Sequence, residues 1–173
     1  MNELDEVWAR MTNKALEKAR ADGRGDVAEY LELKTTNDTI RTASVKWLLD
    51  ATLEIASFAN RNNASITIEN ENPHQFSFGN ANLVGSLVRF RQGVRCLTVE
   101  AGWTRTPNDG FMRGGALAIA RISHFGISKH NAELLLIKSN DFPHWFFVDE
   151  NGKRDLFDSR HLNQHFQLFL GEL

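Results

Sequence analysis

The loop of residues 102–115 offers the clearest binding chemistry in the sequence. Arg105 and Arg113 flank an Asn-Asp-Gly turn that contains Asp109, and a Gly-Gly pair beginning at Gly114 follows. A guanidinium forms paired hydrogen bonds with phosphate or carboxylate, and glycine lets a ligand approach the backbone closely. We therefore expect this loop to recognise an anionic ligand or an anionic protein partner. The predicted ligand-binding residues are Arg105, Arg113, Arg89, Arg91, Gly114 and Asp109.

The charge distribution points to the same part of the chain. Residues 83–124 contain six arginines but only two carboxylates, Glu100 and Asp109, whereas residues 1–82 and 125–173 are each acidic on balance. A local excess of basic charge attracts anionic partners. The alternative interpretation is a plain strand connection, whose arginines pair with Glu100 and Asp109 or lie in water.

Nucleic-acid binding is one alternative function. Arg89 and Arg91 alternate along a predicted strand and would give its surface a basic strip. Single-stranded nucleic acids also need aromatic side chains on such a surface, because bases stack on them. We expect Phe90 and Trp103 on the opposite, buried face. The pI of about 6.3 is far below that of a dedicated nucleic-acid-binding domain.

The chain contains six histidines, which raises the question of a metal site. His161 and His165 are four residues apart in a predicted helix, so both rings can lie on one face, with Asp158 one turn earlier. Zinc-protease helices have a glutamate after the first histidine, but Leu162 occupies that place. Such a pair also arises on any half-exposed helix. We expect no metal and no cofactor.

A small hydrolase-like enzyme is the other alternative. Its pocket would lie between the sheet and the helices, with a histidine or Glu100 as the acid or base. The carboxylates Glu69, Glu71 and Glu100 could gather on the sheet as those of a metal-dependent nuclease do. However, no lysine follows Glu100 closely, and no Gly-x-Ser-x-Gly nucleophile motif occurs. We therefore name no catalytic residue and favour a non-catalytic binding or adaptor module.

The composition is that of one globular domain, residues 1–173. The hydrophobic residues make up 42% of the chain and the charged residues 24%, which is apolar enough to form a core. Cys96 is the single cysteine, so no intrachain disulfide is expected. No apolar run approaches the ~20 residues of a membrane span, and the acidic start is unlike a signal peptide. We expect a cytoplasmic protein without membrane contact.

Helical spacing of apolar residues dominates residues 1–62. One stripe runs from Leu4 to Ala19, and a longer one occupies residues 38–60 after Thr36 and Asn37. Residues 27–34 between these stripes fit a helix better than a short strand. A final helix is expected over residues 159–171, with Leu162, Phe166 and Phe169 inward.

Residues 64–157 alternate between apolar and polar, which is typical of strands. Strands are predicted at 83–91 and 94–104, joined by a hairpin at Gln92-Gly93, and at 116–123, 132–139 and 144–150. Asn151-Gly152 predicts another hairpin, onto residues 153–157. Strands with short connections form an antiparallel sheet, so the expected class is α+β. We predict about five to seven strands, with the C-terminal helix and the long helix packed on one sheet face.

The segment from Phe142 to Phe147 contains more aromatic side chains than one face of a sheet can bury. Trp145 and Phe147 are expected on one side of this strand, and Phe146 on the other. The side that the core does not cover needs a helix, a ligand or a second subunit. A homodimer is therefore a plausible state of this protein.

Overall fold

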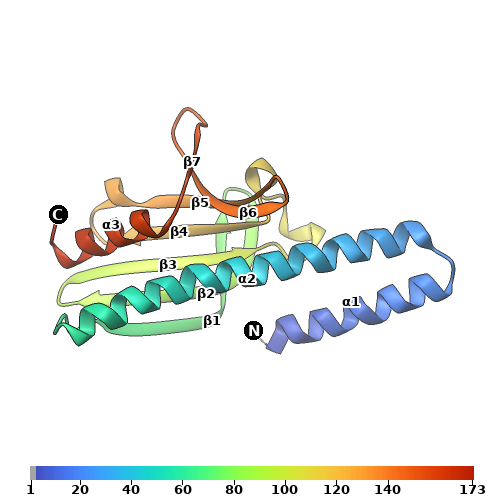
Figure 1. Ribbon diagram of the computed structural model, residues 1–173, viewed down its shortest axis with the longest axis horizontal. Coiled ribbons are helices and arrows are strands. Elements are labelled where there is room, and N and C mark those ends of the chain that lie inside the picture. Colours follow the sequence, from blue (N-terminus) through green and yellow to red (C-terminus); the bar gives the residue numbers. More distant parts are fainter. Residues whose placement is uncertain (1–2) are drawn as a thin grey trace. The chain divides into compact units, whose positions relative to one another are not determined.

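The structure, a computed structural model, describes residues 3–173. The chain divides into two compact units, Met1–Ala43 and Ser44–Leu173, and each is described by itself. Unit 1 contains α1 (Glu3–Ala21) and the first part of α2 (Gly25–Arg61). Unit 2 contains the rest of α2, a seven-stranded antiparallel sheet and α3 (Ser159–Leu170), so the predicted α+β class is confirmed (Figure 1).

Unit 1 is a helical hairpin with a very small interior. The chain turns at Gly23, which has a φ of 68°, and the Arg24 N–H donates to the Ala19 carbonyl at 2.9 Å. Among residues 3–43 only Ala19 and Ala28 are buried. Packing inside the hairpin therefore contributes little hydrophobic stabilisation, because two methyl groups remove little apolar surface from water.

The predicted helix boundary at Thr36 and Asn37 was wrong, because α2 runs without interruption from Gly25 to Arg61. The polar residues of this stretch are accommodated inside the helix. Thr39 donates its hydroxyl to the Thr35 carbonyl one turn earlier, at 3.0 Å. The Asp38 carboxylate accepts a hydrogen bond from Lys34 at 2.9 Å, an i,i+4 ion pair that supports the helix.

The sheet of unit 2 is a simple meander, in which each strand pairs with its neighbours in sequence. Two-residue and other short connections join most strands, and the longest connection, residues 104–117, lies between the third and fourth strands. The strands are β1 (Thr67–Phe78), β2 (Ala81–Gln92), β3 (Arg95–Trp103), β4 (Ala118–His124), β5 (Ala132–Ser139), β6 (Phe142–Val148) and β7 (Arg154–Leu156).

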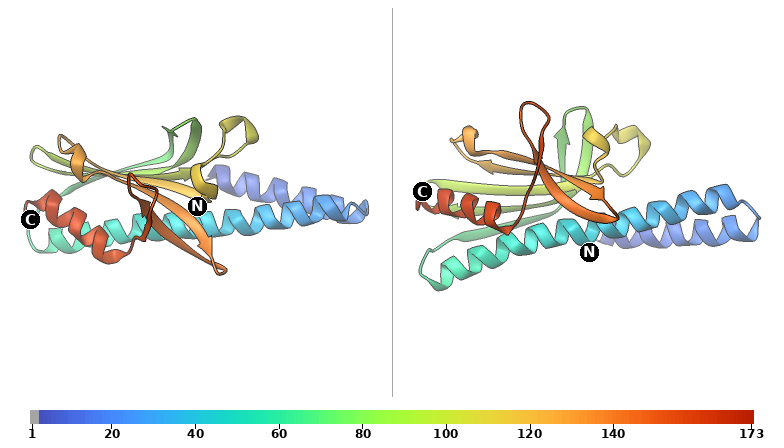
Figure 2. Two further views of the ribbon diagram at one scale, coloured as in Figure 1. Left: turned by 90° about the horizontal axis from the view of Figure 1, so that it is seen from above. Right: turned by 45° about the horizontal axis from the view of Figure 1, so that its top comes forward.

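One face of the sheet, the helix face, packs against residues 44–61 of α2 and against α3, as predicted (Figure 2). Alternate residues of β3 and β4 point to this face, and their side chains are fully buried. The Phe90 ring meets the Phe166 ring of α3 edge-on, with centroids 5.1 Å apart. The buried helix-face residues of the central strands include Phe90, Leu97, Val99, Ala101, Ala120, Ile122 and Leu134.

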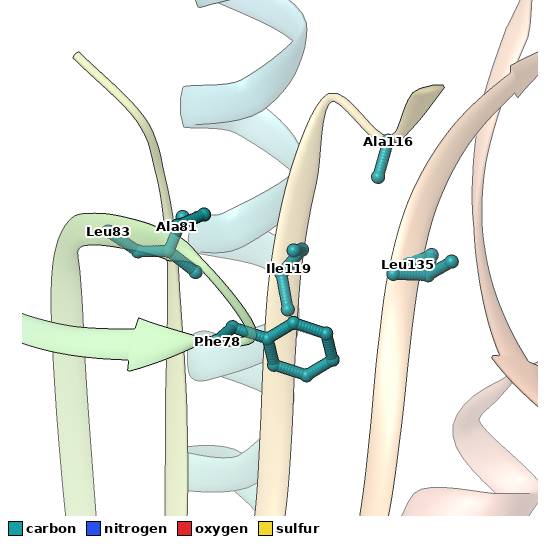
Figure 3. Packing of buried hydrophobic residues seen from close by; sticks show 6 residues of the cluster. All are labelled: Phe78, Ala81, Leu83, Ala116, Ile119 and Leu135. Atoms are coloured by element: carbon teal, nitrogen blue, oxygen red, sulfur yellow. The ribbon is translucent and has the colours of Figure 1, made fainter. Parts of the chain in front are cut away.

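The other face, the open face, has a smaller apolar cluster at one end. Phe78, Leu83 and Ile119 form its centre, and their side chains point toward one another (Figure 3). Ala116 and Met112 belong to the 104–117 connection and pack against this cluster. The long connection is therefore anchored to the sheet by apolar contacts.

The β2–β3 hairpin closes one residue later than predicted. Gln92 pairs with Arg95, so the turn residues are Gly93 and Val94, and Gly93 has a φ of 59°. The change moves the cross-strand partners by two positions, which keeps every side chain on its face because the strand period is two. The predicted burial of Phe90 and Trp103 on the side opposite to Arg89 is confirmed.

The β6–β7 connection also differs from the prediction. Val148 pairs with Arg154, so the loop spans residues 149–153 and is not a two-residue Asn-Gly turn. The Asp149 carboxylate orders this loop by accepting from the backbone N–H of Asn151 at 2.9 Å and of Lys153 at 2.8 Å. A side-chain acceptor two residues before the Asn-Gly pair thus determines a longer turn.

Most of the aromatic segment of β6 is covered within the chain. Trp145 is buried on the helix face and donates its Nε1–H to the Ser44 carbonyl at 3.3 Å. The Phe147 ring packs edge-on against Phe157. Phe142 remains exposed. One exposed ring at a strand end is ordinary for a monomer. This segment therefore does not support the homodimer, which stays a prediction.

A pair of facing glycines sets the closest approach between β2 and β3. Gly85 lies opposite Gly102, and a Cβ on Gly85 would overlap the carbonyl oxygen of Ala101. We expect Gly85→Ala to lower the free energy of unfolding by about 2 kcal/mol or more, because the strands must separate to admit the methyl group. Urea unfolding measures the change. The neighbouring Ser86→Ala, which adds no atoms, is the control, and equal midpoints for the two variants would contradict the packing.

Candidate functional site

Arg105 and Asp109 are both used to order the long connection. The Asp109 carboxylate accepts hydrogen bonds from the backbone N–H of Thr106 at 2.8 Å and of Arg105 at 3.1 Å. These two hydrogen bonds lower the pKa of Asp109. The Arg105 guanidinium stacks over the Trp103 ring at 3.8 Å and donates to the Val84 carbonyl at 2.9 Å. The contacts of both side chains hold the loop against β2 and β3.

Arg113 and Gly114 lie at the other end of this connection. The Arg113 guanidinium is 5.7 Å from the centre of the Phe78 ring, which belongs to the open face. Trp103, the ring under Arg105, is on the helix face, because it alternates in phase with Ala101. The structure therefore does not bring Arg105 and Arg113 together. Gly114 has a φ of 66°, and its carbonyl accepts a hydrogen bond from Arg154 at 3.2 Å.

Arg89 and Arg91 share one carboxylate on the open face. Arg89 Nη1 lies 3.0 Å from Glu69 Oε2, and Arg91 Nε lies 3.3 Å from Glu69 Oε1. Glu69 is directly opposite Arg89 in the β1–β2 pair. The two arginines of the predicted basic strip thus share one carboxylate, which neutralises one of their two charges.

A second charged network occupies the middle of the open face. His74 bridges two carboxylates, with Nε2 2.7 Å from Glu100 Oε2 and Nδ1 3.0 Å from Glu71 Oε1. The hydrogen bond with His74 lowers the pKa of Glu71. Arg121 donates to the other oxygen of Glu100 at 2.9 Å. Both oxygens of Glu100, the residue considered as an acid or base, are therefore engaged, and Glu69 lies outside this network.

A concave site of about 520 Å³ lies between α3 and the β5–β6 end of the sheet. We call it the histidine pocket. Half of its ten lining residues carry rings, and the lining comes from three separate parts of unit 2. The lining residues are His130, Asn131, Ala132, Glu133, Phe147, Val148, Phe157, His161, Gln164 and His165. A second groove of about 360 Å³ between α2 and α3 contains one titratable group, Glu172.

Two histidines join α3 to the sheet beside this pocket. His124 Nε2 of β4 lies 2.9 Å from His165 Nδ1 of α3, so one proton can be shared between the two rings. Burial lowers the pKa of His165 to about 4, with further contributions from the nearby charges of His124, His130 and His161. Burial also lowers the pKa of His124. Both rings are therefore neutral at pH 7, and of the two His165 lines the pocket.

His161 has a carboxylate neighbour. Its Nδ1 lies 2.9 Å from Asp158 Oδ1, and Asp158 also caps α3 by accepting from the backbone N–H of Arg160 at 3.0 Å. Hydrogen bonds from the Arg160 side chain, and then from backbone N–H groups, lower the pKa of Asp158 to about 2. The His161 ring stacks on Phe157, with centroids 5.7 Å apart. The capping residue thus fixes the orientation of an imidazole in the pocket wall.

The predicted pair His161 and His165 does line one pocket, but the rings have different partners. Nδ1 of His165 is occupied by His124, whereas Nδ1 of His161 faces Asp158. Among residues 3–173 no group of three or more His, Cys, Asp or Glu side chains has the arrangement of a metal site. Cys96 is half-buried on β3, and its sulfur lies 3.9 Å from the Thr98 hydroxyl.

Sequence reasoning missed His124 and His130 as parts of the site. His124 alternates in phase with Ile122 and Ala120, so the period of β4 alone places it on the buried helix face. The alternation of β4 could be read from the sequence. The contact between His124 and His165 could not be predicted in this way, because the two residues are 41 positions apart.

The neutral histidine pair predicts how stability depends on pH. His165 has a pKa of about 4 in the folded chain and an ordinary value of 6.5. The unfolded chain therefore binds more protons between these values, so the stabilisation is complete above pH 6.5 and is lost as the pH falls toward 4. One such group accounts for a loss of about 2 kcal/mol at pH 5.

Urea unfolding of a His165→Gln variant measures this contribution, since the amide retains a hydrogen-bonding partner for His124 but does not titrate. We expect the variant to lose less stability between pH 7 and pH 5 than the natural chain does. His144→Gln, at an exposed position of β6, should keep the natural pH dependence. The same loss in all three proteins would contradict the role of the pair.

Comparison with known proteins gives no relative from which a function can be carried over. No protein-family model, curated protein sequence or solved structure matches the chain. Among the described residues, no helix combines the length and the apolar character needed to cross a bilayer.

Proposed function

We propose that the chain is a non-catalytic binding module of the cytoplasm that holds a small planar heteroaromatic ligand in the histidine pocket. The observation that carries the proposal is the pocket itself, a cavity of about 520 Å³ with Phe147, Phe157 and His161 in its walls. Small-molecule sites are typically concave, largely apolar and furnished with a few polar groups. The histidine pocket is concave and has four apolar lining residues, two of them phenylalanines, beside six polar or titratable ones.

The ring geometry favours a flat ligand. Phe147 meets His161 edge-on, with centroids 5.1 Å apart, while His161 lies nearly parallel to Phe157. Aromatic rings bind other rings by offset stacking or edge-to-face contact at such separations. A planar ligand can therefore continue the arrangement that the wall residues already form among themselves.

The polar groups favour hydrogen bonding at the edge of that ligand. Asn131 uses its Oδ1 to accept from the His124 backbone N–H at 2.8 Å, which leaves its amide N–H groups as donors. Gln164 is an exposed residue of α3 in the pocket lining, and its amide offers both a donor and an acceptor. Amide side chains of this kind match the donor and acceptor edges of nucleobases.

A hydrolase-like enzyme is the alternative that the pocket also supports. The Asp158 carboxylate beside His161 resembles the orienting carboxylate of a general base. However, the described residues of the pocket lining include no serine, threonine, cysteine or lysine, and Glu133 is the one carboxylate among them. Hydrolysis of a nitrophenyl ester faster than by free histidine, and abolished in His161→Gln, would favour the enzyme.

Anion recognition by the arginine loop and nucleic-acid binding receive less support. Arg105 and Arg113 contact rings on opposite faces of the sheet. Arg89 and Arg91 both form ion pairs with Glu69. An anion would have to displace these contacts, and their loss would lower its affinity.

The proposal is tested by titrating adenosine, as a neutral heteroaromatic probe, into the full chain and following the imidazole carbon–proton NMR signals. We expect the signals of His130, His161 and His165 to shift and that of the exposed His144 to stay. Gln164→Ala should weaken binding by about tenfold, which corresponds to one edge hydrogen bond of about 1.4 kcal/mol. Gln167→Ala, also exposed on α3 but outside the pocket lining, is the matched control.

Two results would overturn this assignment. The first is the absence of histidine shifts with both adenosine and indole at millimolar concentration. The second is binding that Gln164→Ala and Phe147→Leu leave unchanged. Inorganic phosphate is a separate arm of the experiment, and binding of phosphate that is lost in an Arg105→Ala/Arg113→Ala double variant would favour the arginine loop instead.

A further inference from the structure

The lining of the histidine pocket contains a carboxylate but no permanently charged base. Glu133 is the one carboxylate among the ten described lining residues, and none of the ten is a lysine or an arginine. Burial lowers the pKa of His165 to about 4, so this ring adds no positive charge at pH 7. A ligand that enters the pocket therefore meets a negative group, which attracts cations and repels anions.

The charge of Glu133 is not neutralised within the sheet. Glu133 lies directly opposite Arg121 in the β4–β5 pair. Arg121, however, donates to Glu100 at 2.9 Å and to the Ser77 carbonyl at 3.3 Å. Among residues 3–173 no basic side chain forms an ion pair with Glu133, which is exposed near the start of β5. Its carboxylate is therefore available to a ligand.

The carboxylate beside His161 differs from Glu133 in this respect. Asp158 accepts hydrogen bonds from Arg160 Nε at 2.9 Å and from Arg160 Nη2 at 2.8 Å. This pair carries no net charge. Lys129 precedes His130 in sequence, but it does not belong to the lining. Glu133 is thus the charged group of the lining that a ligand can pair with.

The aromatic part of the lining also favours a cation. The face of an aromatic ring carries partial negative charge, and a cation within about 6 Å of the ring centre is stabilised by it. Phe147 is half-buried and lines the cavity, so part of its ring is accessible to a ligand. The pocket therefore contains both kinds of group that attract an organic ammonium ion, a carboxylate and an aromatic ring.

We propose that the ligand of the histidine pocket is a planar heteroaromatic ring that bears a cationic amine, and that Glu133 selects for this charge. The inference deepens the proposed function and rests on it. The ring of the ligand packs against the aromatic walls, and its ammonium group pairs with the Glu133 carboxylate. The same ring with an anionic substituent binds more weakly, because Glu133 repels it.

A phosphorylated ring, such as a nucleotide, fits the lining less well. Phosphate groups are held in proteins by arginine or lysine side chains and by clusters of backbone N–H groups. The described lining residues provide neither arginine nor lysine, and Glu133 would repel the phosphate. The charge of the lining therefore separates amine-bearing rings from phosphorylated ones.

Three probes with one indole ring and side chains of equal length test this inference. Tryptamine is cationic, indole-3-ethanol is neutral and indole-3-acetate is anionic. Each is titrated into the full chain at pH 8 while the imidazole NMR signals are followed. At this pH an alkyl ammonium, with a pKa of about 10.4, keeps its charge, whereas an ordinary imidazole, with a pKa of about 6.5, is neutral. We expect tryptamine to bind about fivefold more tightly than indole-3-ethanol, as for a partly exposed ion pair. Indole-3-acetate should bind most weakly.

Glu133→Gln removes the charge and keeps the shape of the side chain. We expect this variant to bind tryptamine about fivefold more weakly and to leave the affinity for indole-3-ethanol unchanged. Asp141→Asn is the matched control, because it removes the same charge from an exposed position beyond the other end of β5. It should keep the preference for tryptamine, and urea unfolding should show that both variants are folded.

Three results would overturn the inference. The first is equal affinity for the three probes. The second is a preference for tryptamine that persists in Glu133→Gln. The third is tighter binding of indole-3-acetate that is lost in Lys129→Ala, which would assign an anionic ligand. Binding of indole-3-ethanol in any of these cases would leave the proposed function standing, whereas no histidine shift with any probe would reject both.

Discussion

The contact between His124 and His165 is the interaction on which the proposed site depends. It joins β4 to α3 at the edge of the pocket, and it excludes protonation of both rings at once, because two charged imidazoles 2.9 Å apart repel and neither facing nitrogen could then accept a hydrogen bond. Apolar packing of Leu162, Phe166 and Phe169 seats the same helix on the sheet. The hydrophobic contacts therefore determine that α3 docks, and the histidine pair links the docking to pH.

Local patterns were sufficient to predict most elements of unit 2. The alternation of Leu97, Val99 and Ala101 predicted the buried face of β3, and an error of one residue in the Gln92-Gly93 turn did not change it. Period-two patterns tolerate such errors when both strands shift together. The continuity of α2 was not predictable from residue types, because Thr35 and Thr39 break or extend a helix according to whether their hydroxyls bond within it.

The site was harder to predict than the fold, because its chemistry depends on partners far apart in sequence. The six arginines of residues 83–124 suggested a basic surface, but two of them form ion pairs with Glu69 of the neighbouring strand. A local sum of charges does not include a carboxylate that the sheet brings alongside. In the same way, the sequence showed His161 and His165 as a pair, whereas the structure pairs His165 with His124.

The most direct test of this account is an NMR pH titration of each histidine ring in the full chain, with signals assigned by His→Gln variants. The account predicts that His165 titrates near its assigned pKa of about 4 and that the pKa of His124 also lies below the ordinary value. Titration of both rings close to the ordinary histidine pKa of 6.5 would contradict it. Such a result would mean that α3 does not bury the pair.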